Sequence, residues 1–555
     1  MKLGLWLLFS AMASLAAAEL PTITVNHDST PIDRSCVVFI PPGTVIADTN
    51  ADGVLRIVAD NVVVRFAPHS ELRGAAAGTP WDTLKGIGIR VEGHRGVRLE
   101  NARVHGFKCG VVATRADGLF LDGGDFSDNY RQHLRSTPAA ENAADWLYPQ
   151  HNDEIKWRDE YGGAVCIEDS HGVTVKGIRV RRGQNGILLD RVVNSRVYDN
   201  DCSFLSGWGL ALWRSSQNLV TRNAFDFCIR GYVDGVYNRG QDSAGMLCFE
   251  QSSGNVFAEN SATHGGDGFF GFAGREAIGE SWVDQERARL RRETGRQDVD
   301  ALLPVPPALV NQSAPLGCNT NLLLDNDFSY AAAHGIEITF SHGNQILRNR
   351  LVEDAICGIW GGYSTGTLIA GNRIVGNGGM GYGRQRGGID MEHASFNRIL
   401  DNFFRNNKCA IYLWWNSNAP LAHFPWVMAN DHGVRGNVIA GNKFVIDRNE
   451  PFHDLRPGQK LVVLQLSQQG DGHVRDNLFA KNRLRVDPAL GQVLDVQPGC
   501  EPLTNGPVPD YTLPHPVILG HQHPVGARDG LGGRAAIIMD EWGPRDGESP
   551  PRRQR

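Results

Sequence analysis

Carboxylate side chains stand at fixed places in a set of short apolar segments that each begin with glycine. Glu337 follows Gly335 by two residues, and Asp390 and Glu392 follow Gly388 by two and four. Two carboxyl groups on one face can act as a general acid and a general base. A separation of roughly 6.5–9.5 Å is typical of glycoside cleavage with inversion. These residue types therefore point to hydrolysis of a glycosidic bond, provided that the fold brings them together.

The segments recur with a period of 22 to 23 residues. They begin at Gly186, Gly209, Gly268, Gly335, Gly358 and Gly388. Most are followed about fourteen residues later by an asparagine, at Asn200, Asn223, Asn349, Asn372 and Asn402. A fixed period of this size, with strand-like runs, predicts a parallel β-solenoid. Each turn of the chain is one coil, which buries its apolar side chains only by stacking on its neighbours. We expect an all-β, single-stranded solenoid of about ten to eleven coils.

Alternation along a strand sends successive side chains to opposite sides. Aligning the coils on their glycines gives two outward columns. The first contains Leu188, Ala211, Cys248, Phe270, Glu337, Trp360, Asp390 and Tyr412. The second contains Asp190, Trp213, Glu250, Phe272, Thr339, Gly362, Glu392 and Trp414. The outward face of a strand is normally mixed polar. This face is aromatic and acidic and has no lysine or arginine, which suits a sugar ring and its hydroxyl groups.

Asp390 and Glu337 are the catalytic candidates, because they share a column two coils apart, about 9.6 Å along the backbone. Glu392 and Glu250 are expected to bind the substrate or to tune the catalytic pair. Crowded like charges raise the pKa of one carboxyl group, as the role of general acid requires. Substrate contacts are predicted for Trp213, Trp360, Tyr412, Trp414, Phe270, Asp267, His393 and Asp190. The competing interpretation is that insertions cover the aromatic side chains and form a second core. It explains Phe270 well but explains the carboxylates poorly, because unpaired buried charges are costly.

His334, directly before Gly335, offers a different catalytic chemistry. With a nearby tyrosine or arginine it could abstract a proton next to a uronic carboxylate, in a polysaccharide lyase or a C5-epimerase. Such enzymes need cations that neutralise the substrate, and the two columns carry none. A third hypothesis is a glycan-binding protein without catalysis. Hydrolysis by paired carboxylates is the favoured function of the three.

No metal site and no cofactor are predicted, with calcium left open. The chain has no His-Glu-x-x-His and no Cys-x-x-Cys motif. Calcium could lie between Asp190, Glu250 or loop carboxylates. Residues 48–53, Asp-Thr-Asn-Ala-Asp-Gly, resemble the start of a calcium loop, but Ala59 replaces the glutamate expected at its twelfth position. We therefore expect an ordinary polar turn there.

Four regions follow from the composition along the chain. Residues 1–18 are typical of a secretory signal peptide. A cap region at 19–85, the solenoid at 86–486 and an irregular tail at 487–555 follow. The leader predicts a secreted or periplasmic protein, and no other segment reaches the roughly 20 apolar residues of a membrane span. A net charge of −6 argues against nucleic acid. A glycan is the expected partner and a monomer the expected state.

Four stretches are longer than one coil, after Gly110, Gly209, Gly268 and Gly358. We expect all of them to enter at the same corner, just before the glycine-led strand. Insertions gathered on one face of a solenoid usually build its binding wall. In the longest stretch, residues 280–296 have the pattern of a charged helix.

The Gly-Ile-x-Leu segments and the asparagine rhythm resemble those of the right-handed parallel β-helix superfamily over about residues 86–486. That superfamily includes pectate-lyase-like enzymes, β-helix glycoside hydrolases, alginate C5-epimerases and periplasmic NosD-like proteins. The resemblance implies a right-handed β-helix and an exported carbohydrate-active protein. The epimerase motif Asp-Pro-His-Asp is absent, since Asp487-Pro488 is followed by Ala489. No catalytic residue is therefore carried over from the superfamily, because fold does not imply function.

Overall fold

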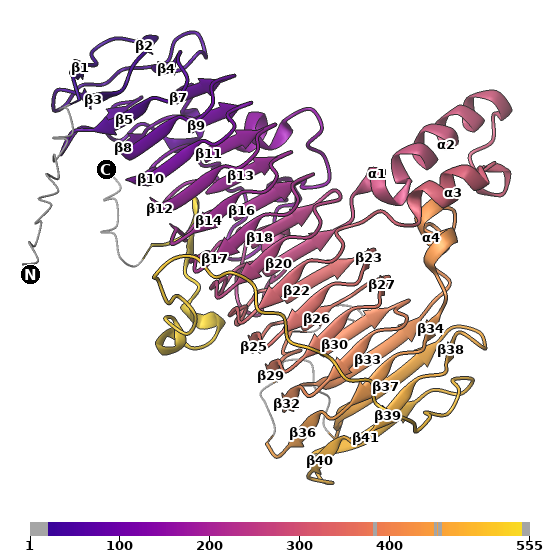
Figure 1. The fold of residues 1–555 in the computed structure, drawn as a ribbon. Helices are drawn as coiled ribbons and strands as arrows, with labels where there is room; N and C mark the ends of the chain where they lie inside the picture. The colour runs from indigo at the N-terminus through magenta and orange to yellow at the C-terminus, as the bar shows by residue number, and fades with distance from the viewer. Residues whose placement is uncertain (1–19, 381–385, 449–451, 453–457, 547–555) are drawn as a thin grey trace, which may run out of the picture.

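The computed structural model describes residues 20–380, 386–448, 452 and 458–546, and the predicted signal peptide lies outside them. The described chain is a long solenoid whose coils stack from the first strands to residue 496 (Figure 1). Sheets of fifteen, seventeen and five strands run along it. Strands of successive coils pair in parallel in all three sheets. The predicted parallel β-helix is confirmed.

Each coil contributes one strand to the fifteen-stranded sheet. Its strands are β2 (Thr30–Ile32), β4 (Leu55–Ile57), β7 (Ile87–Glu92), β9 (Cys109–Thr114), β11 (Gly163–Glu168), β13 (Ile187–Asp190), β16 (Trp208–Trp213), β18 (Ala244–Phe249), β20 (Asp267–Phe272), β22 (His334–Thr339), β26 (Cys357–Trp360), β30 (Gly387–Glu392), β33 (Cys409–Trp415), β37 (Leu461–Gln468) and β41 (Gly491–Val496). We call this sheet the front sheet, because it carries the predicted columns.

The seventeen-stranded sheet forms another side of the coils. Its strands are β1 (Thr22–Thr24), β3 (Cys36–Phe39), β5 (Val63–Phe66), β6 (Leu72–Arg73), β8 (Arg98–His105), β10 (Phe120–Asp125), β12 (Thr174–Val180), β14 (Arg196–Tyr198), β15 (Asp201–Cys202), β17 (Leu219–Thr221), β19 (Val256–Ala258), β21 (Leu322–Leu324), β24 (Gln345–Leu347), β28 (Leu368–Ala370), β31 (Arg398–Leu400), β35 (Val438–Ala440) and β39 (Leu478–Ala480). Strands before Gly86 thus already belong to the long sheets.

A five-stranded sheet closes the later coils. It contains β25 (Arg350–Val352), β29 (Arg373–Val375), β32 (Phe403–Arg405), β36 (Lys443–Ile446) and β40 (Arg483–Val486). Smaller pairs are β23 (Ser341–His342) with β27 (Ser364–Thr365), β34 (Val434–Arg435) with β38 (Val474–Arg475), and β42 (Met539–Asp540) with β43 (Gly543–Pro544). The α-helices of the described residues are α1 (Arg275–Ile278), α2 (Glu280–Thr294), α3 (Pro307–Ser313) and α4 (Pro425–Asn430).

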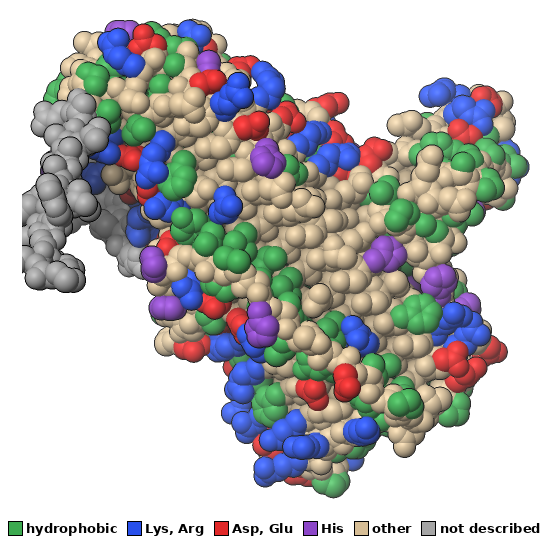
Figure 2. Space-filling view, viewed as in Figure 1, with side chains coloured by type: hydrophobic (Ala, Val, Ile, Leu, Met, Phe, Trp, Pro, Cys, Tyr) green, Lys and Arg blue, Asp and Glu red, His purple; other side chains and the backbone are tan. Residues whose placement is uncertain are grey.

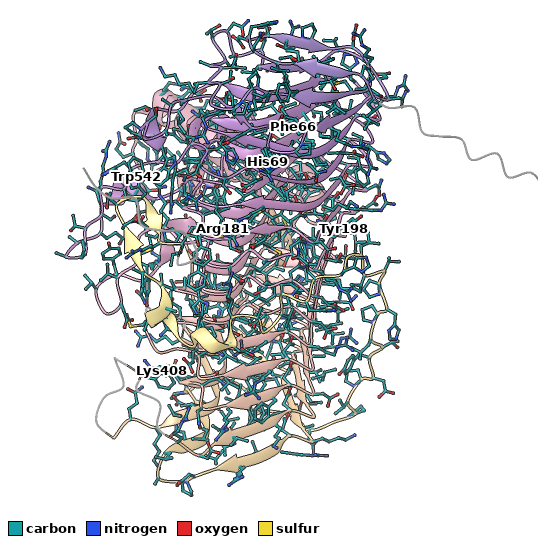
Figure 3. All side chains as sticks on the ribbon, turned by 90° about the vertical axis from the view of Figure 1, so that its left-hand side faces the viewer. Phe66, His69, Arg181, Tyr198, Lys408 and Trp542 are labelled. Carbon is teal, nitrogen blue, oxygen red and sulfur yellow. The ribbon has the colours of Figure 1, made fainter. Side chains whose placement is uncertain are left out.

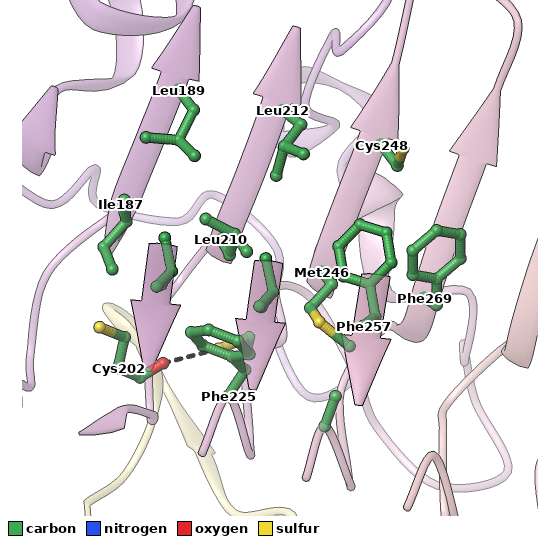
Figure 4. Close-up of a cluster of buried hydrophobic side chains, with 14 of the residues drawn as sticks. Ile187, Leu189, Cys202, Leu210, Leu212, Phe225, Met246, Cys248, Phe257 and Phe269 are labelled. Carbon is green, nitrogen blue, oxygen red and sulfur yellow. Dashed lines mark hydrogen bonds between the residues drawn. The ribbon is translucent and has the colours of Figure 1, made fainter. Parts of the chain in front are cut away.

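Inward side chains of the front sheet stack directly on those of the next coil. Ile187, Leu210, Met246 and Phe269 are register partners on consecutive strands. All four are buried, and Figure 4 shows them in line inside the solenoid. Because each coil alone leaves this apolar edge open, burial of the core depends on stacking.

An asparagine ladder joins the coils at one corner. Asn372 is 1% exposed. Its backbone N–H and its Nδ2 both donate to Asn402 Oδ1 at 2.9 Å, and Nδ2 also donates to the Ile346 carbonyl at 2.8 Å. Its Oδ1 accepts from the backbone N–H and the Nδ2 of Asn349, at 2.8 and 3.1 Å. The ladder comprises Asn200, Asn223, Asn260, Asn326, Asn349, Asn372, Asn402, Asn442 and Asn482.

Insertions border the front sheet at both ends of its strands, and α1 to α4 project from one edge (Figure 1). Residues 126–162, 222–243 and 376–386 precede β11, β18 and β30. The longest insertion, residues 273–321, instead follows β20. The expectation that all four stretches enter before the strand is therefore wrong for this one. The period counts residues per coil but does not say which corner holds the excess. The helix expected at 280–296 is α2.

After β41 the chain returns along the outside of the solenoid (Figures 1 and 3). Tyr511 and Leu513 pack on an outer cluster that includes Leu347. Near the N-terminal coils, the Trp542 ring lies 5.3 Å from that of Trp81. In Figure 2, charges of both signs are interspersed near the two ends of the visible face. Within the described part of the chain, the helices lack the length and apolar character of a membrane span.

We expect Asn372→Ala to lower the melting temperature by several degrees. The substitution removes the acceptor of two Asn349 donors and the donor to Ile346, and each buried group left unpaired costs about 1–3 kcal/mol. Thermal unfolding followed by circular dichroism measures the effect. Asn505→Ala, at an exposed position in the tail, is the control and should melt like the parent protein. Equal melting of both variants would show that the ladder does not hold the coils.

Candidate functional site

One outward column of the front sheet contains both predicted catalytic carboxylates. Phe270, Glu337, Trp360, Asp390 and Tyr412 are register partners on consecutive strands. The aligned period had placed all five in this column. Asp267 and His334, the first residues of β20 and β22, lie in a neighbouring column between Ala244 and Cys357.

The predicted columns are one residue out of register at β18. Leu247 pairs with Ala211 and Phe270, whereas Cys248 points into the core. The coil begins at Gly245 and not at Met246, so that Glu250 lies one residue beyond the strand. Glu250 accepts from the N–H groups of Glu276 and Ala277, at 3.4 and 3.3 Å. It therefore holds the start of α1, and the earlier placement of Glu250 in the second column is corrected.

The aromatic side chains of the earlier coils form a second core and not an open platform. Trp213 is 1% exposed and Phe270 is 7% exposed. They belong to a cluster with Trp157 and Tyr161, which come from the insertion 126–162. The ring of Trp157 lies 5.3 Å from that of Trp213. These two predicted substrate contacts are therefore covered by the insertion, as the competing interpretation had it.

Asp190 lies under the same insertion. Its carboxylate accepts from Asn152 Nδ2 at 2.9 Å and from Arg191 at 2.6 Å. Burial raises the pKa of Asp190 to about 7, against the nearby Arg191. These partners make Asp190 an anchor for the insertion in this structure, and it lies several coils from Asp390.

Asp267, His334 and Glu337 form a compact triad in which Asp267 and His334 are buried and Glu337 is partly exposed. His334 Nδ1 lies 3.2 Å from Asp267 Oδ1 and 3.2 Å from Glu337 Oε2. The backbone N–H of His334 also donates to Asp267 Oδ1, at 2.8 Å. Burial lowers the pKa of His334, but hydrogen bonds to the two carboxylates raise it to about 10. Burial raises the pKa of Glu337 above its usual value, although His334 beside it acts to lower it. His334 therefore carries its proton at neutral pH, with the carboxylates as counterions.

Asp390 is held in a different way. It is fully buried and accepts from Trp414 Nε1 at 2.6 Å and from the Arg386 N–H at 3.1 Å. Burial raises the pKa of Asp390 to about 8 in spite of these hydrogen bonds. Trp414 is thus a support for Asp390. Tyr412, also buried, bonds through its hydroxyl to Ser467 Oγ at 2.6 Å.

Trp360 lies between Glu337 and Asp390 in the column. Its indole stacks on His334, with 5.6 Å between the ring centroids and 22° between the planes. Unlike Trp213, it is partly exposed. It is the aromatic side chain that lies between the two candidate carboxylates in the column.

Asp242 is a site residue that the sequence reasoning missed. Burial, together with the nearby carboxylates of Glu337 and Asp267, raises its pKa to about 7. It comes from the insertion before β18, where Gln241 and Asp242 both have positive φ, 52° and 57°. Such strained positions cluster at functional sites. Its membership of an insertion beside the columns was the one available signal, since no repeat marks it.

His393 and Glu392 lie at the opposite margin, next to the segment of α4. His393 Nδ1 lies 2.9 Å from Asp431 Oδ2, and Nε2 lies 3.1 Å from Asn416 Oδ1. The ring also stacks on Tyr363, at 4.3 Å. Glu392 Oε1 lies 3.8 Å from His393 Nε2. These contacts tie the insertion 416–433 to the sheet.

Two groups among the described residues have the ligand types and spacing for a metal ion. The ligand atoms of Asp267, His334 and Glu337 lie within 4.8 Å of one another, as do those of Asp28, Asp48 and Asp52. In the second group Asp28, from a different segment, joins the loop of residues 48–53. Asp190 and Glu250, where calcium had been left open, belong to neither group.

Comparisons with known proteins agree with the fold. A model of the right-handed beta helix region matches residues 83–262. A model of the periplasmic copper-binding protein NosD matches residues 315–490. Each covers about a third of the chain. No curated protein sequence matches.

Solved structures of similar architecture have low sequence identity. The A-module of the mannuronan C-5 epimerase AlgE4 of Azotobacter vinelandii is 12% identical, with 88% of this chain and 91% of that chain covered and a TM-score of 0.31. The DFA-IIIase of Arthrobacter chlorophenolicus without its lid is 12% identical, with coverage of 68% and 83% and a TM-score of 0.36. A PL6 alginate lyase bound to a trisaccharide is 11% identical, with 87% and 89% covered and a TM-score of 0.33.

Identities and scores this low carry no argument about the reaction. The parallel coils and the match to the right-handed beta helix family model together show the fold class. This chain is a right-handed parallel β-helix protein.

Proposed function

We propose that this protein is a carbohydrate-active enzyme, and more narrowly a glycoside hydrolase with Asp390 as general acid and Glu337 as general base. The observation that carries the proposal is the contrast between two carboxyl groups in one column. Burial raises the pKa of Asp390 to about 8, so that this carboxyl group keeps its proton at neutral pH. Glu337, two coils away, faces the protonated ring of His334. General catalysis needs one carboxyl group that gives a proton and one that takes it, and the contact with His334 favours the ionised form of Glu337.

The spacing of the two groups suits inversion at the anomeric carbon. Two coil steps amount to about 9.6 Å at the backbone, and inverting enzymes hold their carboxyl groups roughly 6.5–9.5 Å apart. In the proposed reaction Asp390 gives its proton to the glycosidic oxygen as the bond to the anomeric carbon breaks. Glu337 takes a proton from the water that attacks this carbon from the opposite face. The sugar between them stacks on Trp360.

His334 is poorly suited to start a lyase or epimerase reaction as a base. Its Nδ1 already faces Asp267 and Glu337, and with a pKa of about 10 it holds its proton at neutral pH. This favours hydrolysis over proton abstraction by His334. Two of the similar structures are named as an epimerase of mannuronan and an alginate lyase. Because a lyase or C5-epimerase that acts on an acidic glycan is the alternative to hydrolysis, acidic glycans belong in the test of this site.

We also propose that the protein acts outside the cytoplasm. Residues 1–18 have the basic start, apolar run and small-residue end of a secretory leader. The family model matched at 315–490 is described as periplasmic. The proposed state remains a monomer.

Digestion of a panel of neutral and acidic glycans tests the reaction. We expect Asp390→Asn and Glu337→Gln each to lower the release of reducing ends at least 100-fold, because each removes one half of the acid–base pair. Glu501→Gln, in the exposed tail, should keep full activity. Products that absorb in the near ultraviolet would identify a lyase instead. Reducing ends that persist in both variants would refute the assigned pair.

The pH dependence of kcat/KM provides a second test. The basic limb should fall with a midpoint near pH 8, because Asp390 loses its proton there. The carboxyl in an unfolded chain has a pKa of about 3.9, so the folded state binds this proton more tightly. The stability that this bound proton provides is complete below the unfolded-state pKa and is lost as pH rises through about 8.

The melting temperature of Asp390→Asn should therefore rise relative to that of the parent protein as pH increases from 5 to 9. Thermal melts of both proteins across this range measure the difference, with Glu501→Gln as the control that follows the parent curve. A constant difference across the range would mean that Asp390 is charged when buried, and the acid role would fail.

A further inference from the structure

Two buried nitrogen atoms beside the candidate carboxylates have no hydrogen-bond partner among the described residues. They are Nε2 of His334 and Nε1 of Trp360. Buried polar atoms of folded proteins are nearly always paired, and an unpaired one needs an explanation such as an absent ligand. His334 as a whole is 5% exposed, so that its free nitrogen is not served by bulk solvent.

The surroundings of His334 explain why its free nitrogen stays unpaired. Asp267 and Glu337 hold the other ring nitrogen, both at 3.2 Å. Turning the ring to pair Nε2 would break both contacts. The ring is further fixed by stacking on Trp360 at 5.6 Å. The His334 ring is therefore fixed by three neighbouring side chains, and its Nε2 forms no hydrogen bond with any of them.

Trp360 lies next to both of the proposed catalytic carboxylates. Trp360 is the register partner of Glu337 on one side and of Asp390 on the other. His334 lies on the same strand as Glu337 and contacts it. Both unpaired nitrogen atoms thus belong to side chains that lie beside the proposed acid and base.

We propose that His334 Nε2 and Trp360 Nε1 together bind an oxygen atom of the sugar that lies between Glu337 and Asp390, an inference that rests on the proposed function. The indole N–H of Trp360 only donates, so the group that it binds must be an acceptor oxygen. A hydroxyl of a neutral sugar and a carboxylate of a uronic acid both meet this requirement.

The first experiment compares two tryptophan-to-phenylalanine variants in the absence of sugar. Trp426→Phe removes an indole N–H that donates to the Leu316 carbonyl at 2.9 Å. It should lower the melting temperature by several degrees. Trp360→Phe keeps a ring on His334 and loses no hydrogen bond, so its melting temperature should stay within about one degree of the parent value or rise. A loss as large as that of Trp426→Phe would show a structural partner for the Trp360 N–H and overturn the proposal.

The second experiment observes the donor directly. The indole N–H signal of Trp360 is assigned in a ¹H–¹⁵N spectrum by its absence from Trp360→Phe. One arm of the titration uses glucose, galactose and mannose, and the other uses glucuronate, galacturonate and mannuronate. We expect the signal to move to lower field in one arm. Calorimetry should then show binding at least ten-fold weaker in Trp360→Phe and unchanged in Trp426→Phe.

The arm that responds identifies the acceptor as a hydroxyl or a carboxylate. A Trp360 signal that moves in neither arm, or binding that Trp360→Phe leaves unchanged, would overturn the donor site. Failure of the proposed hydrolase has a different signature. In that case Asp390→Asn and Glu337→Gln would keep their activity while the Trp360 signal still responds to sugar.

Discussion

The stacking distance of the coils is the constraint on which the rest of this structure depends. Each asparagine of the ladder bonds to the coil on either side, as Asn372 does to Asn349 and Asn402. These bonds satisfy backbone groups at a corner that would otherwise be buried without partners. They also keep the coils in strict register. The columns of the front sheet, and with them the separation of Glu337 and Asp390, follow from that register.

The site shows how a protein holds several carboxyl groups in a small buried volume. An isolated buried charge is expensive, so the group must be neutralised or paired. Asp390 keeps its proton, while Asp267 and Glu337 share the charge of His334. Asp242 approaches from an insertion with a pKa of about 7. Burial and pairing have thus produced carboxyl groups with unlike protonation behaviour from residues of the same chemical type.

Different segments cover the earlier and the later coils of the front sheet. Over the earlier coils, the insertion 126–162 packs Trp157 against Trp208 and Trp213 and makes a dry second core. Over the later coils, polar and charged groups gather beside Trp360. Helices α1, α2 and α4 contribute side chains to an apolar cluster at one edge that includes Trp426, and α3 contacts α4. The insertions therefore decide which part of a uniform repeat can carry chemistry.

The period by itself determined the solenoid, the ladder and the column of Glu337, Trp360, Asp390 and Tyr412, because equal spacing along a coiled chain becomes vertical alignment. It was one residue wrong at β18, where Gly245 and not Met246 opens the coil. Only the tertiary structure decided that Asp242 lies near the triad, that Glu250 holds α1 and that Trp213 is covered. Insertions have no period, and their side chains meet the sheet through contacts between residues far apart in the chain. Those contacts depend on packing and on the cost of burying charge, neither of which a repeat encodes.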